Sequence, residues 1–157
     1  MAETQDAETG ARLTELVKGI RFAMLTSADD TGGLHARPLT PQRVDDDGTV
    51  WFLVDADADW VSASMTSVNV AFTDSDTWVS ATGSATLVKD QAVLEDLGDP
   101  ESDAWFQEGT TPAALRVDVA EADYWDAPNR VVQLLKVGKA LVTRSQPDIG
   151  ERGVVRP

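Results

Sequence analysis

The sequence predicts an α+β barrel built mainly from antiparallel strands, and three observations support this. Short segments with strand character recur along the chain, acidic or glycine-containing turns separate them, and helical patterns lie between and after them. Their order does not follow the strand–helix–strand alternation of a parallel sheet. Hydrophobic residues make up 42% of the 157 residues, which is enough for one core in one domain.

An amphipathic helix over residues 11–20 is the first element expected. Its apolar residues recur at helical spacing: Leu13, Leu16, Val17 and Ile20. Thr9 is a candidate N-cap. Because residues 1–10 are polar and acidic and lack the apolar run of a signal peptide, we expect a flexible N-terminus followed by one domain over residues 11–157.

Two hairpins and a short helix are expected next. The strand-like segments are Phe22–Ser27, Leu34–Val44 and Thr49–Asp55, and the last two are joined by the acidic turn Asp45–Gly48. A weakly amphipathic pattern then predicts a short helix over Ala58–Thr66.

Three more strands complete the expected set: Val68–Thr73, Trp78–Val88 and Ala113–Trp125. Gly83 inside the second of these indicates a bend or a close approach of the backbone. Asp90 is a good N-cap for a helix that continues to Leu97. A closing helix over residues 131–141 and a turn-rich strap after Gln146 end the chain.

Arg37 and Pro38 are unusual inside a strand. Proline cannot donate a ladder hydrogen bond, so this pair belongs at a bulge or on an edge strand. A bulge can aim the arginine toward a ligand. The alternative is an edge strand whose arginine is simply solvated, and the pattern alone does not choose between the two.

Several motifs in sequence order resemble the general stress protein branch of the pyridoxamine 5′-phosphate oxidase-like split barrels. They are Arg37-Pro38-Leu39, Trp51-Phe52-Leu53, Gly83-Ser84-Ala85, Trp105-Phe106, Ala122–Asp126 and Pro147–Glu151. The resemblance runs from about Leu13 to Val155. It implies a six-stranded antiparallel split β-barrel with flanking helices, a homodimer, and FMN bound at the dimer interface.

The resemblance also implies a set of cofactor-binding residues. Arg37 would bind the FMN phosphate, because a guanidinium matches phosphate geometry with two hydrogen bonds. Pro38 and Leu39 would offer backbone contacts and the walls of a slot, and Leu53 and Val54 would line the flavin ring. Trp125 or Trp78 would cover the ring from the partner subunit, with packing in a core or interface as the alternative.

The chain departs from this pattern at the phosphate. FMN-binding relatives usually carry a threonine and then a lysine after the Trp-Phe strand, and here those positions are Val54 and Trp60, with Asp59 in between. Losing one charge-assisted contact costs about 1.5–3 kcal/mol. Asp55, Asp57 and Asp59 would add repulsion, so the resemblance implies FMN binding that is weak or lost.

Composition narrows the classes of function. The net charge of −14 repels nucleic acid and anionic membranes, and no apolar run approaches the ~20 residues of a membrane span. There is no cysteine, so thiolate chemistry is excluded. His35 is the only histidine, which argues against a Ser-His-Asp triad or a histidine-rich metal site. We expect an acidic cytoplasmic protein with no metal site.

Three hypotheses of function stay open. The first is an FMN-binding protein with weak oxidoreductase activity, since the cofactor would carry the chemistry that the chain's own residues do not. The second is a non-catalytic module for a flavin or a similar planar anionic ligand. The third is a homologue that keeps the fold and has lost FMN. No catalytic residue is assigned under any of them.

Overall fold

The computed structural model describes residues 2–98, 109–126 and 151–157. The closing helix expected over residues 131–141 lies outside these ranges, as do Trp105-Phe106 and most of the strap after Gln146. In the described ranges, no helix has the length and apolar character needed to cross a membrane.

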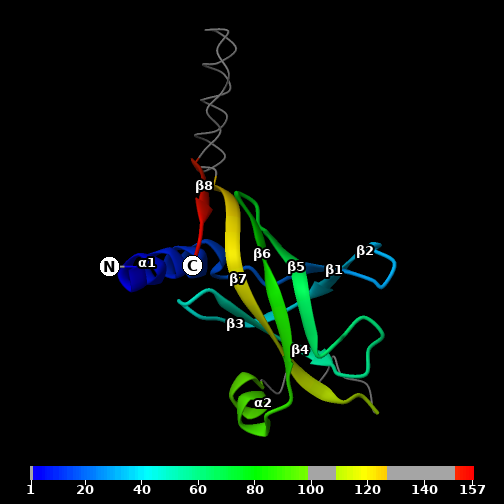
Figure 1. Ribbon diagram of the computed structural model, residues 1–157. Helices are drawn as coiled ribbons and strands as arrows, with labels where there is room; N and C mark the ends of the chain where they lie inside the picture. Colours follow the sequence, from blue (N-terminus) through cyan, green and yellow to red (C-terminus); the bar gives the residue numbers. More distant parts are fainter. Residues whose placement is uncertain (1, 99–108, 127–150) are drawn as a thin grey trace, which may run out of the picture.

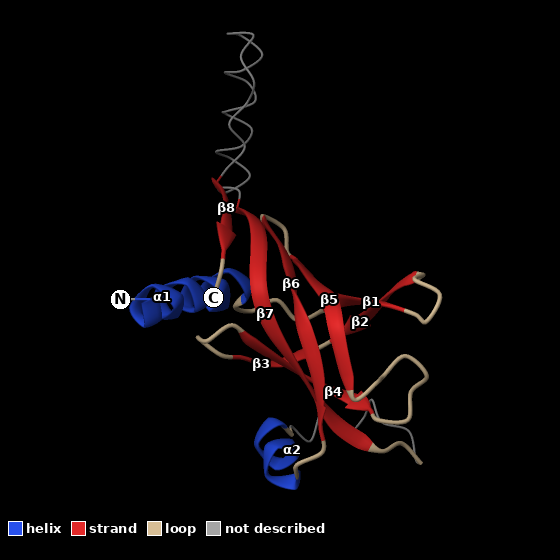
Figure 2. Ribbon diagram, viewed as in Figure 1, coloured by secondary structure: helices blue, strands red, loops and turns tan. Residues whose placement is uncertain are grey.

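The described residues fold as a curled antiparallel sheet with two helices (Figures 1 and 2). The helices are α1 (Ala2–Val17) and α2 (Gln91–Leu97). The strands are β1 (Ala23–Ala28), β2 (Leu34–Leu39), β3 (Pro41–Val44), β4 (Thr49–Asp55), β5 (Ser64–Thr73), β6 (Thr77–Val88), β7 (Pro112–Asp126) and β8 (Glu151–Val155). Their spatial order is β2-β1-β5-β6-β7-β4-β3, and β8 pairs with β7.

The strand order shows why the sheet curls into a half-barrel. β2 and β3 stand at opposite ends of the order, yet only Thr40 separates them in sequence. The two ends of the sheet must therefore come together at Thr40, which confirms the predicted split-barrel class. Eight strands form instead of six, because the expected strand Leu34–Val44 breaks at Thr40 and the tail contributes β8.

The core lies inside the curl, on the face that β1, β4, β5 and β7 share with α1. The largest fully buried side chains come from these elements: Leu13, Leu25, Phe52, Phe72 and Leu115. The alternation predicted for the strands therefore holds. Gly83 is also explained, because a Cβ there would lie 1.9 Å from the carbonyl oxygen of Asp118. The β6–β7 register shifts at the same point.

The two helices predicted over residues 11–20 and 58–66 need correction. α1 begins at Ala2 and ends at Val17, so Thr9 lies within it and is not its N-cap. Residues 58–66 form no helix, since the chain turns after β4 and β5 begins at Ser64. The Asp55 carboxylate accepts a hydrogen bond from the Asp57 N–H at 3.0 Å, and such a side-chain turn competes with helix formation.

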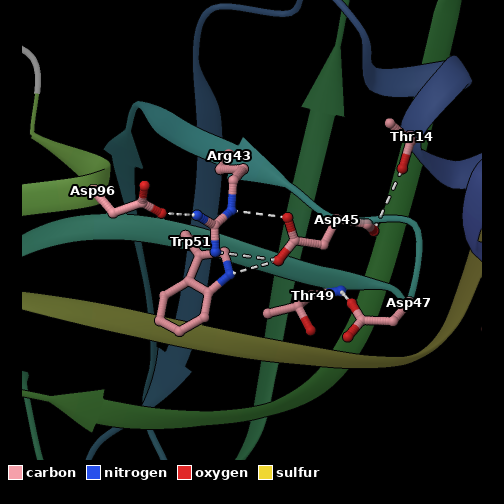
Figure 3. Close-up of polar contacts among 7 residues, drawn as sticks. All are labelled: Thr14, Arg43, Asp45, Asp47, Thr49, Trp51 and Asp96. Atoms are coloured by element: carbon pink, nitrogen blue, oxygen red, sulfur yellow. Dashed lines mark hydrogen bonds and ion pairs between the residues drawn. The ribbon is translucent and has the colours of Figure 1, made fainter. Parts of the chain in front are cut away.

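The prediction for α2 is confirmed. Asp90 caps it by accepting a hydrogen bond from the Ala92 N–H at 2.8 Å. Arg43 on β3 then ties this helix to the β3–β4 hairpin, as Figure 3 shows. Its guanidinium forms an ion pair with Asp96 of α2. Its buried Nε lies 2.8 Å from an Asp45 carboxylate oxygen, but the angle at the Nε–H is not that of a hydrogen bond. The Trp51 indole donates to the same Asp45 carboxylate at 3.0 Å.

Candidate functional site

A cavity of about 400 Å³ opens where β2, β3 and β4 meet the turn after β4. We call it the apolar pocket. Most of its walls are hydrophobic: Phe22, Pro38, Leu39, Leu53, Val54 and Trp60. Thr40, Gln42, Asp55 and Thr110 add polar atoms. This size and this mixture of apolar walls with a few polar groups are typical of sites for small planar ligands.

A second cavity of about 170 Å³ lies next to the first, and Trp60 lines both. We call it the Arg37 pocket. Its ionisable lining residues are Asp29, Asp30, His35, Arg37 and Asp59. The indole of Trp60 is thus a shared wall, with apolar side chains on one side and charged side chains on the other.

Strand pairing explains why Arg37 faces inward although it lies on an edge strand. Within the described chain β2 pairs only with β1, which confirms the edge position expected from Pro38. Arg37 stands opposite the buried Leu25, and cross-strand partners share a face. The edge position therefore leaves the arginine half-buried on the inner face of the sheet instead of solvated.

The guanidinium of Arg37 already has two neighbours. Its Nη1 donates a hydrogen bond to the Ser27 hydroxyl at 2.9 Å, and Ser27 is buried. Its central carbon lies 4.2 Å from the centroid of the Trp60 ring, which is close range for a cation–π contact. Burial lowers the pKa of Arg37, but an arginine stays protonated at neutral pH.

Asp29 organises the β1–β2 turn beside this cation. Its Oδ1 accepts hydrogen bonds from the Thr31 N–H, the Thr31 hydroxyl and the Gly33 N–H at 2.7–2.9 Å. Its Oδ2 lies 2.8 Å from His35 Nε2. These contacts, with the Thr31 hydroxyl first and His35 next, hold the pKa of Asp29 well below its usual range.

The turn after β4 is anchored by two of the acidic residues expected to repel a phosphate. The Asp55 carboxylate accepts from the Thr111 N–H at 3.2 Å, and the Thr111 hydroxyl donates to Asp57 at 2.7 Å. Asp55 lines the apolar pocket and Asp59 the Arg37 pocket, while Asp57 lines neither.

The structure brings most of the predicted site residues together. Pro38, Leu39, Leu53, Val54 and Trp60 line the apolar pocket, and Arg37 and Asp59 join Trp60 at the Arg37 pocket. Trp125 is elsewhere, opposite Trp78 near the far end of β7. It lines neither the apolar pocket nor the Arg37 pocket.

Sequence reasoning did not assign five residues of the apolar pocket: Phe22, Thr40, Gln42, Ala58 and Thr110. They come from a strand flank, the β2–β3 break, β3, the turn after β4 and the segment before β7. Their proximity depends on the closure of the curl at Thr40, which no local pattern signals. In the described part of the chain, no three His, Asp or Glu side chains form a group that could hold a metal ion.

Comparison with known proteins now places the chain. The family model for pyridoxamine 5′-phosphate oxidase-like proteins matches residues 8–148. The chain belongs to this family. No curated protein sequence matches it.

Solved structures agree with the family assignment. A general stress family protein from Xanthomonas campestris pv. campestris is 30% identical, with a TM-score of 0.59 over 82% of this chain and 90% of that one. The general stress FMN/FAD binding protein of Xanthomonas citri is 28% identical, with a TM-score of 0.58 over 80% and 90%. A protein named general stress protein 26 from Jannaschia sp. CCS1 shares the fold over the full length of both chains at 21% identity, with a TM-score of 0.72.

Proposed function

We propose that this protein binds a flavin, with the planar ring in the apolar pocket. The pocket itself carries the proposal, because residues from separate strands and turns line one mostly apolar cavity of about 400 Å³ that also contains a few polar groups. Family membership supports it, as does the similarity to the FMN/FAD binding protein of Xanthomonas citri.

In this proposal the protein contributes binding and the exclusion of water. Leu39, Leu53 and Val54 provide apolar contact area, and the indole of Trp60 offers a flat wall. The flavin would supply the redox chemistry. The Asp55 carboxylate is engaged with backbone N–H groups of Asp57 and Thr111, so we assign it no proton transfer. The proposed activity is accordingly a weak oxidoreductase, with a non-catalytic flavin module as the alternative.

The residues fit the flavin ring, but they do not fit its phosphate. Within the described ranges no lysine or arginine lines the apolar pocket, and the nearby Arg37 shares its own pocket with three carboxylates. A charge-assisted hydrogen bond contributes about 1.5–3 kcal/mol, so each missing contact lowers affinity roughly tenfold or more. FMN binding should therefore be weak.

We also propose a homodimer. Apolar side chains remain exposed on strands of the sheet, including Met24 on β1 and the cross-strand pair Trp78 and Trp125, each about 40% exposed. Large aromatic side chains exposed together commonly mark interfaces. Light scattering should give twice the chain mass at micromolar concentration, and the double variant Trp78→Ser/Trp125→Ser should lower it. A monomeric wild-type protein would contradict the proposal.

Flavin binding is tested by fluorescence-quenching titration of the purified protein, after identification of any ligand that co-purifies. Ala58→Trp fills the apolar pocket and should abolish quenching, whereas Ala92→Trp on the exposed surface of α2 should not change it. If the wild-type protein does not quench flavin fluorescence, or if Ala58→Trp binds flavin as well as Ala92→Trp does, the site is wrong. Reduction of the bound flavin by a chemical or nicotinamide donor then separates an oxidoreductase from a binding module.

A further inference from the structure

The charge around the two pockets is opposite to what a phosphorylated ligand requires. Among the described residues, Asp29, Asp30 and Asp59 line the Arg37 pocket beside a single guanidinium. With His35 counted as uncharged, three carboxylates against one cation leave two net negative charges. Among the described residues that line the apolar pocket, the only ionisable one is Asp55, which is also acidic. A ligand tail that leaves the apolar pocket past Trp60 therefore enters a negative field.

Arg37 cannot cancel this field. One N–H of its guanidinium is used by the buried Ser27 hydroxyl, and one face lies on the Trp60 ring. A phosphate monoester carries a charge of about −1.5 to −2 at pH 7. A single, partly engaged cation would have to offset both that charge and the neighbouring carboxylates.

The acidic character is built into the fold on the Asp29 side. Four hydrogen-bond contacts hold the Asp29 carboxylate in the β1–β2 turn, and they favour its ionised form. Asp30 and Asp59 are exposed and can be changed without disturbing such a network. They are therefore the residues with which the field can be tested.

We propose that this site selects a planar ligand without a phosphate, such as an unphosphorylated flavin, over the corresponding phosphate ester. The proposal rests on the proposed flavin site and adds the ligand class that it prefers. The apolar pocket supplies the attraction for the ring, and the carboxylates around Arg37 supply the discrimination against the phosphate.

Riboflavin and FMN form a matched pair of probes, because they differ only in the phosphate. Both are titrated against the full-length protein by fluorescence quenching, at low and at physiological ionic strength. Riboflavin should bind more tightly by about tenfold at low salt, which is the scale of repulsion between such charges ~10 Å apart in a water-like dielectric. Added salt should strengthen FMN binding and leave riboflavin binding nearly unchanged.

The variant Asp30→Asn/Asp59→Asn should reduce this preference, by roughly threefold for each charge removed, through tighter FMN binding alone. Asp46→Asn is the control for the effect of one charge, since it removes one carboxylate from the β3–β4 turn, outside both pockets, and it is compared with the change per charge in the double variant. FMN binding more tightly than riboflavin would overturn the preference and leave the flavin site standing. An equal effect of Asp46→Asn would also overturn it, since the discrimination would then come from net charge. If neither flavin binds, the proposed function and the preference both fail.

Discussion

Replacing Arg37 with alanine should change both the stability of the fold and the recognition of phosphate. The side chain contributes a cation–π contact to Trp60, worth about 0.5–1 kcal/mol at a partly exposed site. It also donates to the buried Ser27 hydroxyl, and the loss of a typical hydrogen bond costs about 0.5–1.5 kcal/mol. Together these losses predict a destabilisation of about 1–2.5 kcal/mol.

The effect on ligands should be selective. Arg37 is the one lysine or arginine among the described residues that line the two pockets. Its donors are shared, so the lower end of the range for a charged hydrogen bond applies, about 1.5 kcal/mol. FMN should therefore bind about tenfold more weakly to Arg37→Ala, while riboflavin affinity stays nearly constant. Arg37→Lys keeps the charge but loses the planar stacking, so its FMN affinity should fall between those of the wild type and Arg37→Ala.

Urea denaturation measures the first effect and flavin titration the second. Arg116→Ala is the matched control, because Arg116 also lies over a tryptophan, 5.8 Å from the Trp51 ring, but lines neither pocket. It should leave both flavin affinities unchanged. If FMN affinity is the same in Arg37→Ala as in the wild type, Arg37 does not contact the phosphate and the arrangement argued above is wrong.

Three further predictions concern the fold. Gly83→Ala should destabilise the protein by about 1–3 kcal/mol or more in urea denaturation. The new Cβ would collide with the carbonyl oxygen of Asp118, and this backbone atom cannot move away as a flexible side chain could. The ionised Asp29 carboxylate stabilises the fold, because its pKa is lower in the folded protein than in the unfolded chain. This stabilisation is complete at pH values above about 4, the ordinary carboxyl pKa, and is lost as the pH falls toward the lowered pKa. The melting temperatures of the wild type and Asp29→Asn should therefore differ at pH 6, and the difference should begin to shrink only below about pH 4. Asp96→Asn should lower the free energy of unfolding by less than about 1 kcal/mol in the same denaturation assay, because the ion pair of Asp96 with Arg43 (Figure 3) is largely exposed. A larger loss would contradict this and would mean that the ion pair stabilises the fold more than its exposure indicates.

The fold could be predicted from local signals where those signals are strong. Alternating apolar residues indicated the strands around Val70 and Val117, and both residues are fully buried. Asp90 and Gly83 each carried a local reason for their positions, as a helix cap and as a close approach of two strands. The prediction of a helix over residues 58–66 was wrong because it rested on a weak periodicity, whereas the Asp55 carboxylate forms a side-chain turn that competes with a helix.

The candidate site was harder to predict from the sequence than the strands were, because it depends on contacts between segments that are far apart in the chain. Arg37 could be singled out by the proline beside it, but its contacts with Ser27 and Trp60 require the pairing of β1 with β2 and the position of the turn after β4. Pro41 marks the break at Thr40 locally, but it does not indicate that β2 and β3 close the curl by standing at opposite ends of the strand order. Trp125 was expected to act from a partner subunit, and within this chain it lines neither pocket.

Trp60 shows how one position links these observations. The resemblance to FMN-binding relatives implies a cation there, and this chain has an indole that lines both pockets and lies against Arg37. An indole adds apolar contact area for a flat ring and supports the remaining cation, but it cannot neutralise a phosphate. In the proposed site, an indole at this position therefore adds to the binding of the ring and provides no contact for the charge. With an indole in place of a cation, the proposed site would favour a planar ligand that carries no phosphate group.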